Sequence, residues 1–256
     1  SVDASRSSLN ASTSADGNGG SIAIRSGDQL IIREGRFDAS SSSLNVSTSS
    51  SGNAGRITLQ ANDRIVVDGE GTSIRSSSQV ESNQSAHHAS NTVPTGDGGE
   101  ISLSANQIEI RDHASISADT QGEGRGGTII ISPGNDMSLD SHAQISAVTS
   151  GLGRGGTISI DAGRDVELDA GEINVRSYRA RGRAGQINLS ARSILLDNQG
   201  VLDATSDESQ GGNVELNAAD LVMLRRNSLI SAASKGRDSD DGNITIGTNF
   251  LVAVPS

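Results

Sequence analysis

Three arginines recur at a fixed interval of 29 residues, at Arg125, Arg154 and Arg183. If each interval is one structural repeat, their side chains form a row on one edge of the fold, about 5 Å apart. A guanidinium group binds a carboxylate or sulfate through two hydrogen bonds at once, so such a row could hold an anionic glycan. Tyr178, the only tyrosine, is close by in the sequence and could stack on a sugar. The alternative is a row of solvated turn residues, because exposed charges usually contribute little.

An acidic turn is a candidate calcium site, because it places Asp238, Asp240 and Asp241 directly before Gly242. Oxygen-rich turns with glycine can bind Ca²⁺. The turn lacks the EF-hand spacing, however, and the chain lacks the glycine-rich nonapeptide of calcium-binding β-rolls. The competing interpretation is a solvated turn whose Asp and Asn residues favour tight backbone angles.

Two adjacent histidines, His87 and His88, are a candidate metal site. Neighbouring residues on a strand point to opposite faces, so any metal would need ligands from elsewhere in the chain. The competing interpretation is a pair of loop histidines. The four histidines also show no spacing that predicts a nucleophilic triad.

Catalysis is the main alternative class of function. Two aspartate pairs, Asp136 with Asp165 and Asp140 with Asp169, share the 29-residue interval. Paired carboxylates are what a polysaccharide-cleaving enzyme requires. Such enzymes usually present aromatic side chains and long cleft-forming loops to the sugar, whereas this chain has two Phe, one Tyr and no Trp. The aspartates fit better as turn formers at strand ends, so we expect no enzymatic activity, no catalytic residues and no cofactor.

The amino-acid composition limits the classes of partner that the chain could bind. The net charge of −11 argues against nonspecific binding to nucleic acid or to anionic membranes. The chain has no run of apolar residues long enough for a transmembrane helix, so we expect no membrane insertion. Cysteine is absent, which excludes disulfides and thiolate metal sites.

The elements that position these residues repeat along the chain. A glycine opens each repeat, roughly every 30 residues, at Gly20, Gly55, Gly99, Gly127, Gly156, Gly185, Gly212 and Gly242. Three short stretches of alternating apolar and polar residues follow each glycine, which is the pattern of half-buried strands. Three strands per repeat predict an all-β fold, a parallel β-solenoid of about eight coils with three short strands per coil.

The inward side chains of successive repeats match in type, which predicts stacked columns. Ile131, Ile160 and Leu189 should form one column of the first strands. The second strands include the pair Leu221 and Met223. The third strands are led by Phe37 and Ala39, with Leu44 and Val46 in an added limb or a wider loop. Stacked aliphatic residues fill a narrow interior, and this accounts for the scarcity of aromatic residues.

The chain is predicted to be a single domain over residues 1–256. The segment 77–95 is polar and lacks alternation, so we expect a loop that projects from the repeats. Residues 2–4 match residues 37–39, which indicates that the chain begins at the tail of a repeat. We therefore expect a fragment of a longer chain, whose open strand edges could also pair end to end with another copy.

The repeat phrase resembles a known family. The pattern Gly-x-Gly-Gly-x-Ile-x-Ile at 124–131, followed by Asp/Asn-x-Ile-x-Ile and Ile-x-Ala, is similar to the filamentous-haemagglutinin-like exoproteins of two-partner secretion. The large repeat exoproteins of cyanobacteria look most alike, and residues 249–255 are similar to a phrase in that group. The resemblance implies a right-handed parallel β-helix, export through an outer-membrane secretion pore, and display or release at the cell surface. The family's N-terminal secretion domain has no clear counterpart here.

These observations predict a non-catalytic, secreted or cell-surface adhesin or extracellular filament protein, of which this chain is a stiff stalk. Partners would be the secretion pore, glycans or other surface proteins. Two alternatives stay open. One is a polysaccharide-binding or polysaccharide-degrading β-helix, and the other is a purely structural filament subunit.

Overall fold

The computed structural model describes residues 2–5, 8–13, 17–33, 42–48, 51–79, 95–178, 182–236 and 240–254. Within these ranges every regular element is a β-strand, and every pairing between named strands is parallel. The strands form two sheets, one of 15 strands and one of 8. The predicted all-β class with parallel strands is therefore confirmed.

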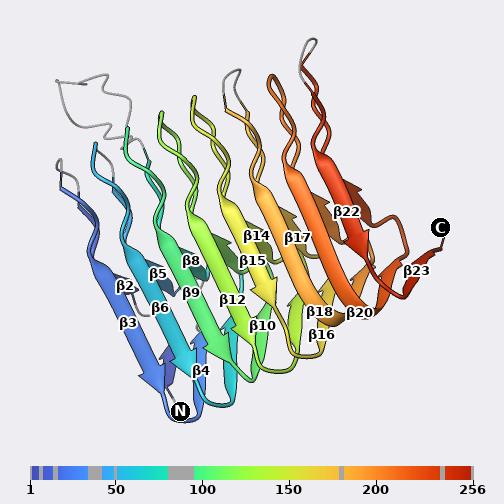
Figure 1. Ribbon diagram of the computed structural model, residues 1–256. Helices are drawn as coiled ribbons and strands as arrows, with labels where there is room; N and C mark the ends of the chain where they lie inside the picture. Colours follow the sequence, from blue (N-terminus) through green and yellow to red (C-terminus); the bar gives the residue numbers. More distant parts are fainter. Residues whose placement is uncertain are drawn as a thin grey trace.

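Three series of strands recur along the chain, and each strand pairs with the strand of its own series in the next repeat. In Figure 1 the first series lies side by side in sequence order, from the blue N-terminal strands to the red C-terminal ones. It follows the repeat glycines and comprises β3 (Ser21–Ser26), β6 (Arg56–Ala61), β9 (Glu100–Ala105), β12 (Thr128–Pro133), β15 (Thr157–Asp161), the first halves of β18 (Gln186–Asp197) and β20 (Asn213–Leu224), and β22 (Asn243–Gly247).

The other two series complete each repeat. The second belongs to the same large sheet and comprises β1 (Val2–Ser5), β4 (Gln29–Arg33), β7 (Arg64–Asp68), β10 (Gln107–Arg111), β13 (Met137–Asp140), β16 (Asp165–Asp169), the second halves of β18 and β20, and β23 (Phe250–Ala253). The third forms the smaller sheet from β2 (Ser8–Asn10), β5 (Ser43–Asn45), β8 (Ser73–Arg75), β11 (Ser115–Ser117), β14 (Gln144–Ser146), β17 (Glu172–Asn174), β19 (Val201–Asp203) and β21 (Leu229–Ser231).

The core lies between the series and consists of stacked aliphatic side chains. Ile131 of β12 pairs with Ile160 of β15, which pairs with Leu189 of β18, and all three are buried. This is the column predicted from the sequence. Because alternate residues of a strand face opposite sides, the same pairing that buries these residues leaves Ile130 and Ser159 on the outer face.

The third strand of the early repeats differs from the prediction. Leu44 of β5, rather than Phe37, pairs with Ile74 of β8, and Leu44 and Val46 are both buried. Residues 37–39 lie outside the described residues. The opening strand β1 pairs with β4 and so belongs to the second series, not to the third. The extra residues of the longer repeat thus precede its third strand instead of following it.

The register of β20 also differs from the prediction. Val222 and Leu224, not Leu221 and Met223, continue the inward column of Ile194 and Leu196. Val222 is fully buried. The pairing shifts just before this point, because Arg192 in β18 lies opposite two residues in β20, Ala219 and Asp220. The inward face of β20 therefore stays on even-numbered residues, from Val214 to Val222. In β18 it changes from Ile187 and Leu189 to Ile194 and Leu196, as expected when only one of two paired strands carries the extra residue of a β-bulge.

The prediction of a loop over residues 77–95 is wrong at its first residues. Ser77 and Ser78 are buried, and Ser78 bridges Thr48 and Thr120 of the neighbouring repeats. The Gln79 N–H donates to the Thr48 carbonyl over 2.9 Å. Residues 77–79 therefore belong to the paired body of the protein, and 80–94 lie outside the described residues. No helix in the described part of the chain is long and apolar enough to cross a membrane.

Candidate functional site

The arginine row forms as predicted. The Gly126 N–H donates to the Arg154 carbonyl over 2.8 Å, and the Gly155 N–H donates to the Arg183 carbonyl over 2.9 Å, so the three arginines occupy equivalent places in successive repeats. Arg125 and Arg154 are exposed and Arg183 is half-buried. The three guanidinium groups form no ion pair with any described residue.

The arginines line one side of a cavity of about 360 Å³. Its floor is backbone, because the adjoining positions are glycines such as Gly155 and Gly156. A Cβ added to Gly156 would lie 2.1 Å from the Gly127 carbonyl oxygen, which is closer than any side chain tolerates. Its far side is a column of polar side chains at the starts of the first-series strands, comprising Thr128, Thr157, Gln186 and Asn213.

A second cavity of about 830 Å³ extends this groove toward the N-terminal repeats and shares Thr128 with the first. Here Asn18, Asn53 and Asp97 hold the place of the arginines. The side chain of each residue accepts a hydrogen bond from the backbone N–H of the equivalent residue in the next repeat. The Asn53 N–H donates to the Asn18 side chain over 2.9 Å, and the Asp97 N–H donates to the Asn53 side chain over 2.9 Å. The last hydrogen bond of this series is donated by the Arg125 N–H to the Asp97 carboxylate over 2.7 Å. Arginine thus replaces a structural Asn/Asp ladder at Arg125.

Tyr178 does not line this groove. Its ring lies 4.9 Å from the guanidinium carbon of Arg176, a cation–π contact with an arginine outside the row. Arg176 is also paired with Asp207 over 3.1 Å and with Asp203 over 3.6 Å. The hydroxyphenyl group is 41% exposed, but its nearest cation is already engaged by two carboxylates.

The calcium candidates are only partly described. Asp238 lies outside the described residues, as do His87 and His88. The Asp241 carboxylate accepts the Ser234 N–H over 2.8 Å, and the Asp240 carbonyl accepts the Gly211 N–H over 3.2 Å. Across the described ranges, no group of three or more His, Asp or Glu side chains is placed to hold a metal ion. The two described aspartates make the hydrogen bonds of a turn.

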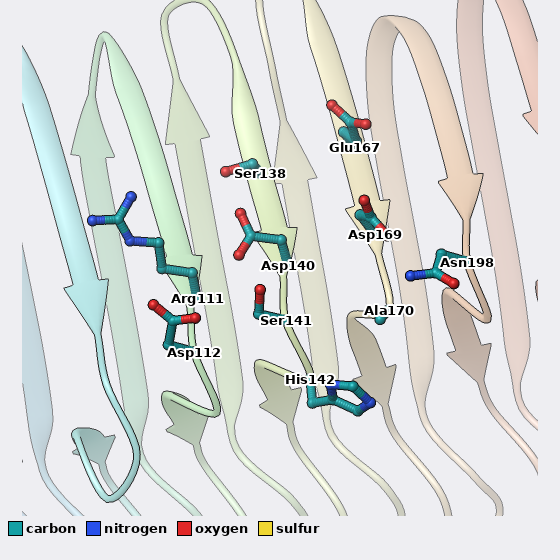
Figure 2. Close-up of a pocket in the computed structure, with 10 residues that line it drawn as sticks. All are labelled: Arg111, Asp112, Ser138, Asp140, Ser141, His142, Glu167, Asp169, Ala170 and Asn198. Atoms are coloured by element: carbon teal, nitrogen blue, oxygen red, sulfur yellow. The ribbon is translucent and has the colours of Figure 1, made fainter.

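The second aspartate pair belongs to an acidic pocket that sequence reasoning did not find. Asp140 pairs directly with Asp169, and Asp169 pairs with Asp197, so three carboxylates succeed one another at the ends of the second-series strands. The first two, Asp140 and Asp169, line a cavity of about 610 Å³ (Figure 2). Figure 2 shows Asp140 and Asp169 on neighbouring strands, with Glu167 farther along one of them and Asp112 at the flank.

A row of tight turns places this pocket. The residues Asp112, Ser141, Ala170 and Asn198 each open a turn with φ between 49° and 58°. This left-handed region suits Asn and Asp, whose side chains tolerate it. Because the turns stack, the rings of His113 and His142 lie parallel, with centroids 5.3 Å apart. The signal for the pocket was the recurrence of polar residues after each second strand.

The charges of the acidic pocket are unevenly balanced. Burial raises the pKa of Asp140. A hydrogen bond with the Asp68 carboxyl, together with burial, raises the pKa of Asp112. Asp197 is 1% exposed, and hydrogen bonds from Arg226, then Arg225 and the Asn198 N–H, hold its pKa well below the ordinary value. Two arginines therefore neutralise Asp197. At Asp140 the hydrogen bond with Ser141 and the charge of Arg111 act in the same direction, but burial outweighs them.

Replacing Asp197 with Asn should lower the unfolding midpoint at pH 7 by a few degrees, because Arg225 and Arg226 lose the buried carboxylate with which they pair. The folded-state pKa is depressed, so the stabilisation is complete above the unfolded-state pKa of about 4 and declines as the pH falls toward the folded-state value. Thermal unfolding from pH 7 to pH 2 should show the parent and variant converging. Asp165→Asn, at an exposed ion pair with Arg192, is the control and should change little. A difference that stays constant with pH would contradict the prediction.

The groove and the acidic pocket are built alike, from one side chain contributed by each successive repeat. The groove offers unpaired cations and a polar wall, and the pocket offers a carboxyl group with a raised pKa beside a second carboxylate. Neither arrangement specifies a reaction by itself. Comparison of the chain with protein-family models, with curated proteins and with solved structures finds no match.

Proposed function

We propose that this chain is a right-handed parallel β-helix, a β-solenoid of about eight coils with three short strands per coil. We propose further that it serves as a stiff, non-catalytic stalk in a secreted or cell-surface adhesin. The observation that carries the proposal is the unbroken parallel pairing of each strand series from repeat to repeat. Strands that pair this way advance about 4.8 Å per repeat, so eight repeats would give a body near 40 Å long.

Stiffness follows from the same pairing. Main-chain hydrogen bonds run between successive repeats, and the aliphatic columns stack in the same direction. Bending such a body would open both at once, and buried backbone groups without partners are costly. A scaffold of this kind holds surface side chains at fixed spacing, which is what a contact surface on an adhesin requires.

The repeat phrase at 124–131 supports an extracellular location through its resemblance to filamentous-haemagglutinin-like exoproteins. On that resemblance, export would use an outer-membrane partner pore, and glycans or other surface proteins would be the ligands. The acidic pocket favours a second candidate, cleavage of a polysaccharide by Asp140 and Asp169, because the two residues pair directly on neighbouring strands and line one cavity, where burial raises the pKa of Asp140.

A glycan array combined with a screen for depolymerisation tests these functions. The adhesin proposal expects retention on immobilised glycans with no release of fragments. Release of new reducing ends that Asp140→Asn abolishes would overturn it in favour of the enzyme. Failure to bind any glycan or cell surface would overturn it in favour of a purely structural filament subunit.

A further inference from the structure

We propose that the arginine groove, the cavity between Arg125, Arg154 and Arg183 on one side and Thr128 and Thr157 on the other, binds an extended acidic polysaccharide. The inference rests on the proposed adhesin role and names its ligand class. The groove runs across successive repeats, so it suits a polymer lying along the body.

The arginines of the groove are available to bind an anionic ligand. Three other exposed arginines are already paired with carboxylates: Arg56 with Glu100 over 2.8 Å, Arg164 with Asp136 over 3.4 Å, and Arg192 with Asp165 over 2.9 Å. The three arginines of the groove have no such partner among the described residues. Like charges repeated about every 4.8 Å repel one another, and a ligand that alternates its own anions along the row relieves that repulsion.

The side of the groove opposite the arginines carries threonine hydroxyl groups. Thr128 pairs directly with Thr157, so their hydroxyls form a row parallel to the arginines. Neither hydroxyl hydrogen-bonds to another described residue. A groove with cations along one side and hydroxyl groups along the other matches a chain that carries carboxylates or sulfates together with sugar hydroxyls.

The glycine floor of the groove and the length of its cationic stretch determine how a ligand can lie in it. Glycines at 126, 127, 155 and 156 leave the backbone open to close approach by the ligand. The cationic stretch ends at Asp97 on one side, while Gln210 and then Asp240 continue the column on the other. The distance from the first to the third arginine is about 10 Å at the parallel-strand spacing, which defines a short binding register.

A single-stranded nucleic acid is a poorer fit. Proteins that bind it combine cations with aromatic rings on which bases stack. No aromatic side chain lines this groove, and Tyr178 lies against Arg176 instead. A polysaccharide needs no stacking surface when its charges and hydroxyls are both matched.

The test measures binding of polygalacturonate, dextran sulfate, neutral dextran and an oligothymidylate at low and high salt. The variant Arg125→Gln/Arg154→Gln/Arg183→Gln should bind both acidic polysaccharides about 10- to 100-fold more weakly than the parent at low salt. The difference should shrink at high salt. The matched control, Arg25→Gln/Arg164→Gln/Arg192→Gln, removes the same charge from positions that line neither cavity of the groove and should bind like the parent. The two polysaccharides distinguish carboxylate from sulfate ligands.

Two further variants sharpen the test. Gln210→Arg extends the row by one repeat and should tighten binding a few-fold. Thr157→Val removes one hydroxyl from the polar side and should weaken binding a few-fold without changing its salt dependence. Equal binding by the parent and the triple groove variant overturns the groove as the site but leaves adhesion elsewhere intact. No binding of either acidic polysaccharide, or tighter binding of oligothymidylate, overturns the ligand class.

Discussion

Replacing Ile160 with aspartate is expected to destabilise the chain by about 4 kcal/mol or more, because it places an unpaired carboxylate inside the aliphatic column. Ile160 is 1% exposed and lies between Ile131 and Leu189 in the adjacent strands. No described cation is within the column to pair with the new charge. In a chain of this length, thermal unfolding should show a midpoint about 10 °C lower, or no folded state at all.

The control for this prediction is the preceding residue. Ser159→Asp introduces the same charge on the same strand, but Ser159 faces outward and is only half-buried. It should therefore leave the midpoint nearly unchanged. If both variants melt like the parent, the inward face of β15 is assigned wrongly.

Replacing Gly156 with alanine is expected to lower the free energy of unfolding by about 2–4 kcal/mol. The new methyl group would lie 2.1 Å from the Gly127 carbonyl oxygen and 2.8 Å from the Ala147 Cβ. That carbonyl accepts the Thr157 N–H over 3.0 Å, so moving it away breaks a bond of the ladder. Circular dichroism melts should show a midpoint about 5–10 °C lower.

Gly27→Ala provides the comparison, since a Cβ there meets nothing within 4 Å. It should be neutral or slightly stabilising, because alanine restricts the unfolded chain more than glycine does. Equal stability of the two variants would mean that the glycine floor of the groove can move, and that its conformation is not fixed by the repeat above.

The columns of the first strands were predictable because two independent signals coincide there. A glycine fixes where each strand begins, and alternation then fixes its inward face, as at Ile158 and Ile160. The run Leu221 to Leu224 has no such alternation, since all four residues are apolar. Its inward face is identified by the pairing of Val222 with Ile194 and of Leu224 with Leu196, which only the paired structure reveals.

The third strand of the longer repeat was ambiguous for a different reason. Both residues 37–39 and residues 44–46 carry an apolar pair around one polar residue, so the pattern fits either stretch. Pairing with Ile74 selects the second of them. Local sequence contains no information about a partner strand in the next repeat.

The candidate sites also include some residues that the sequence could predict and others that it could not. The arginine row was visible as an interval, because stacking converts equal spacing into adjacency. The threonine side of the groove was not, since Thr128 and Thr157 look like ordinary outward strand residues. The acidic pocket depends on left-handed turns at positions such as Ser141 and Asn198, and no single residue type marks those turns.

The replacement of the Asn/Asp ladder by arginine from Arg125 onward has a consequence for avidity. Each repeat contributes one group to the column, so duplicating a repeat would add one binding element at a known distance. A ligand with matching periodicity would then engage the added element as an intramolecular event, at a high effective concentration. Copy number alone could therefore tune the strength of attachment, while the aliphatic columns inside stayed as they are.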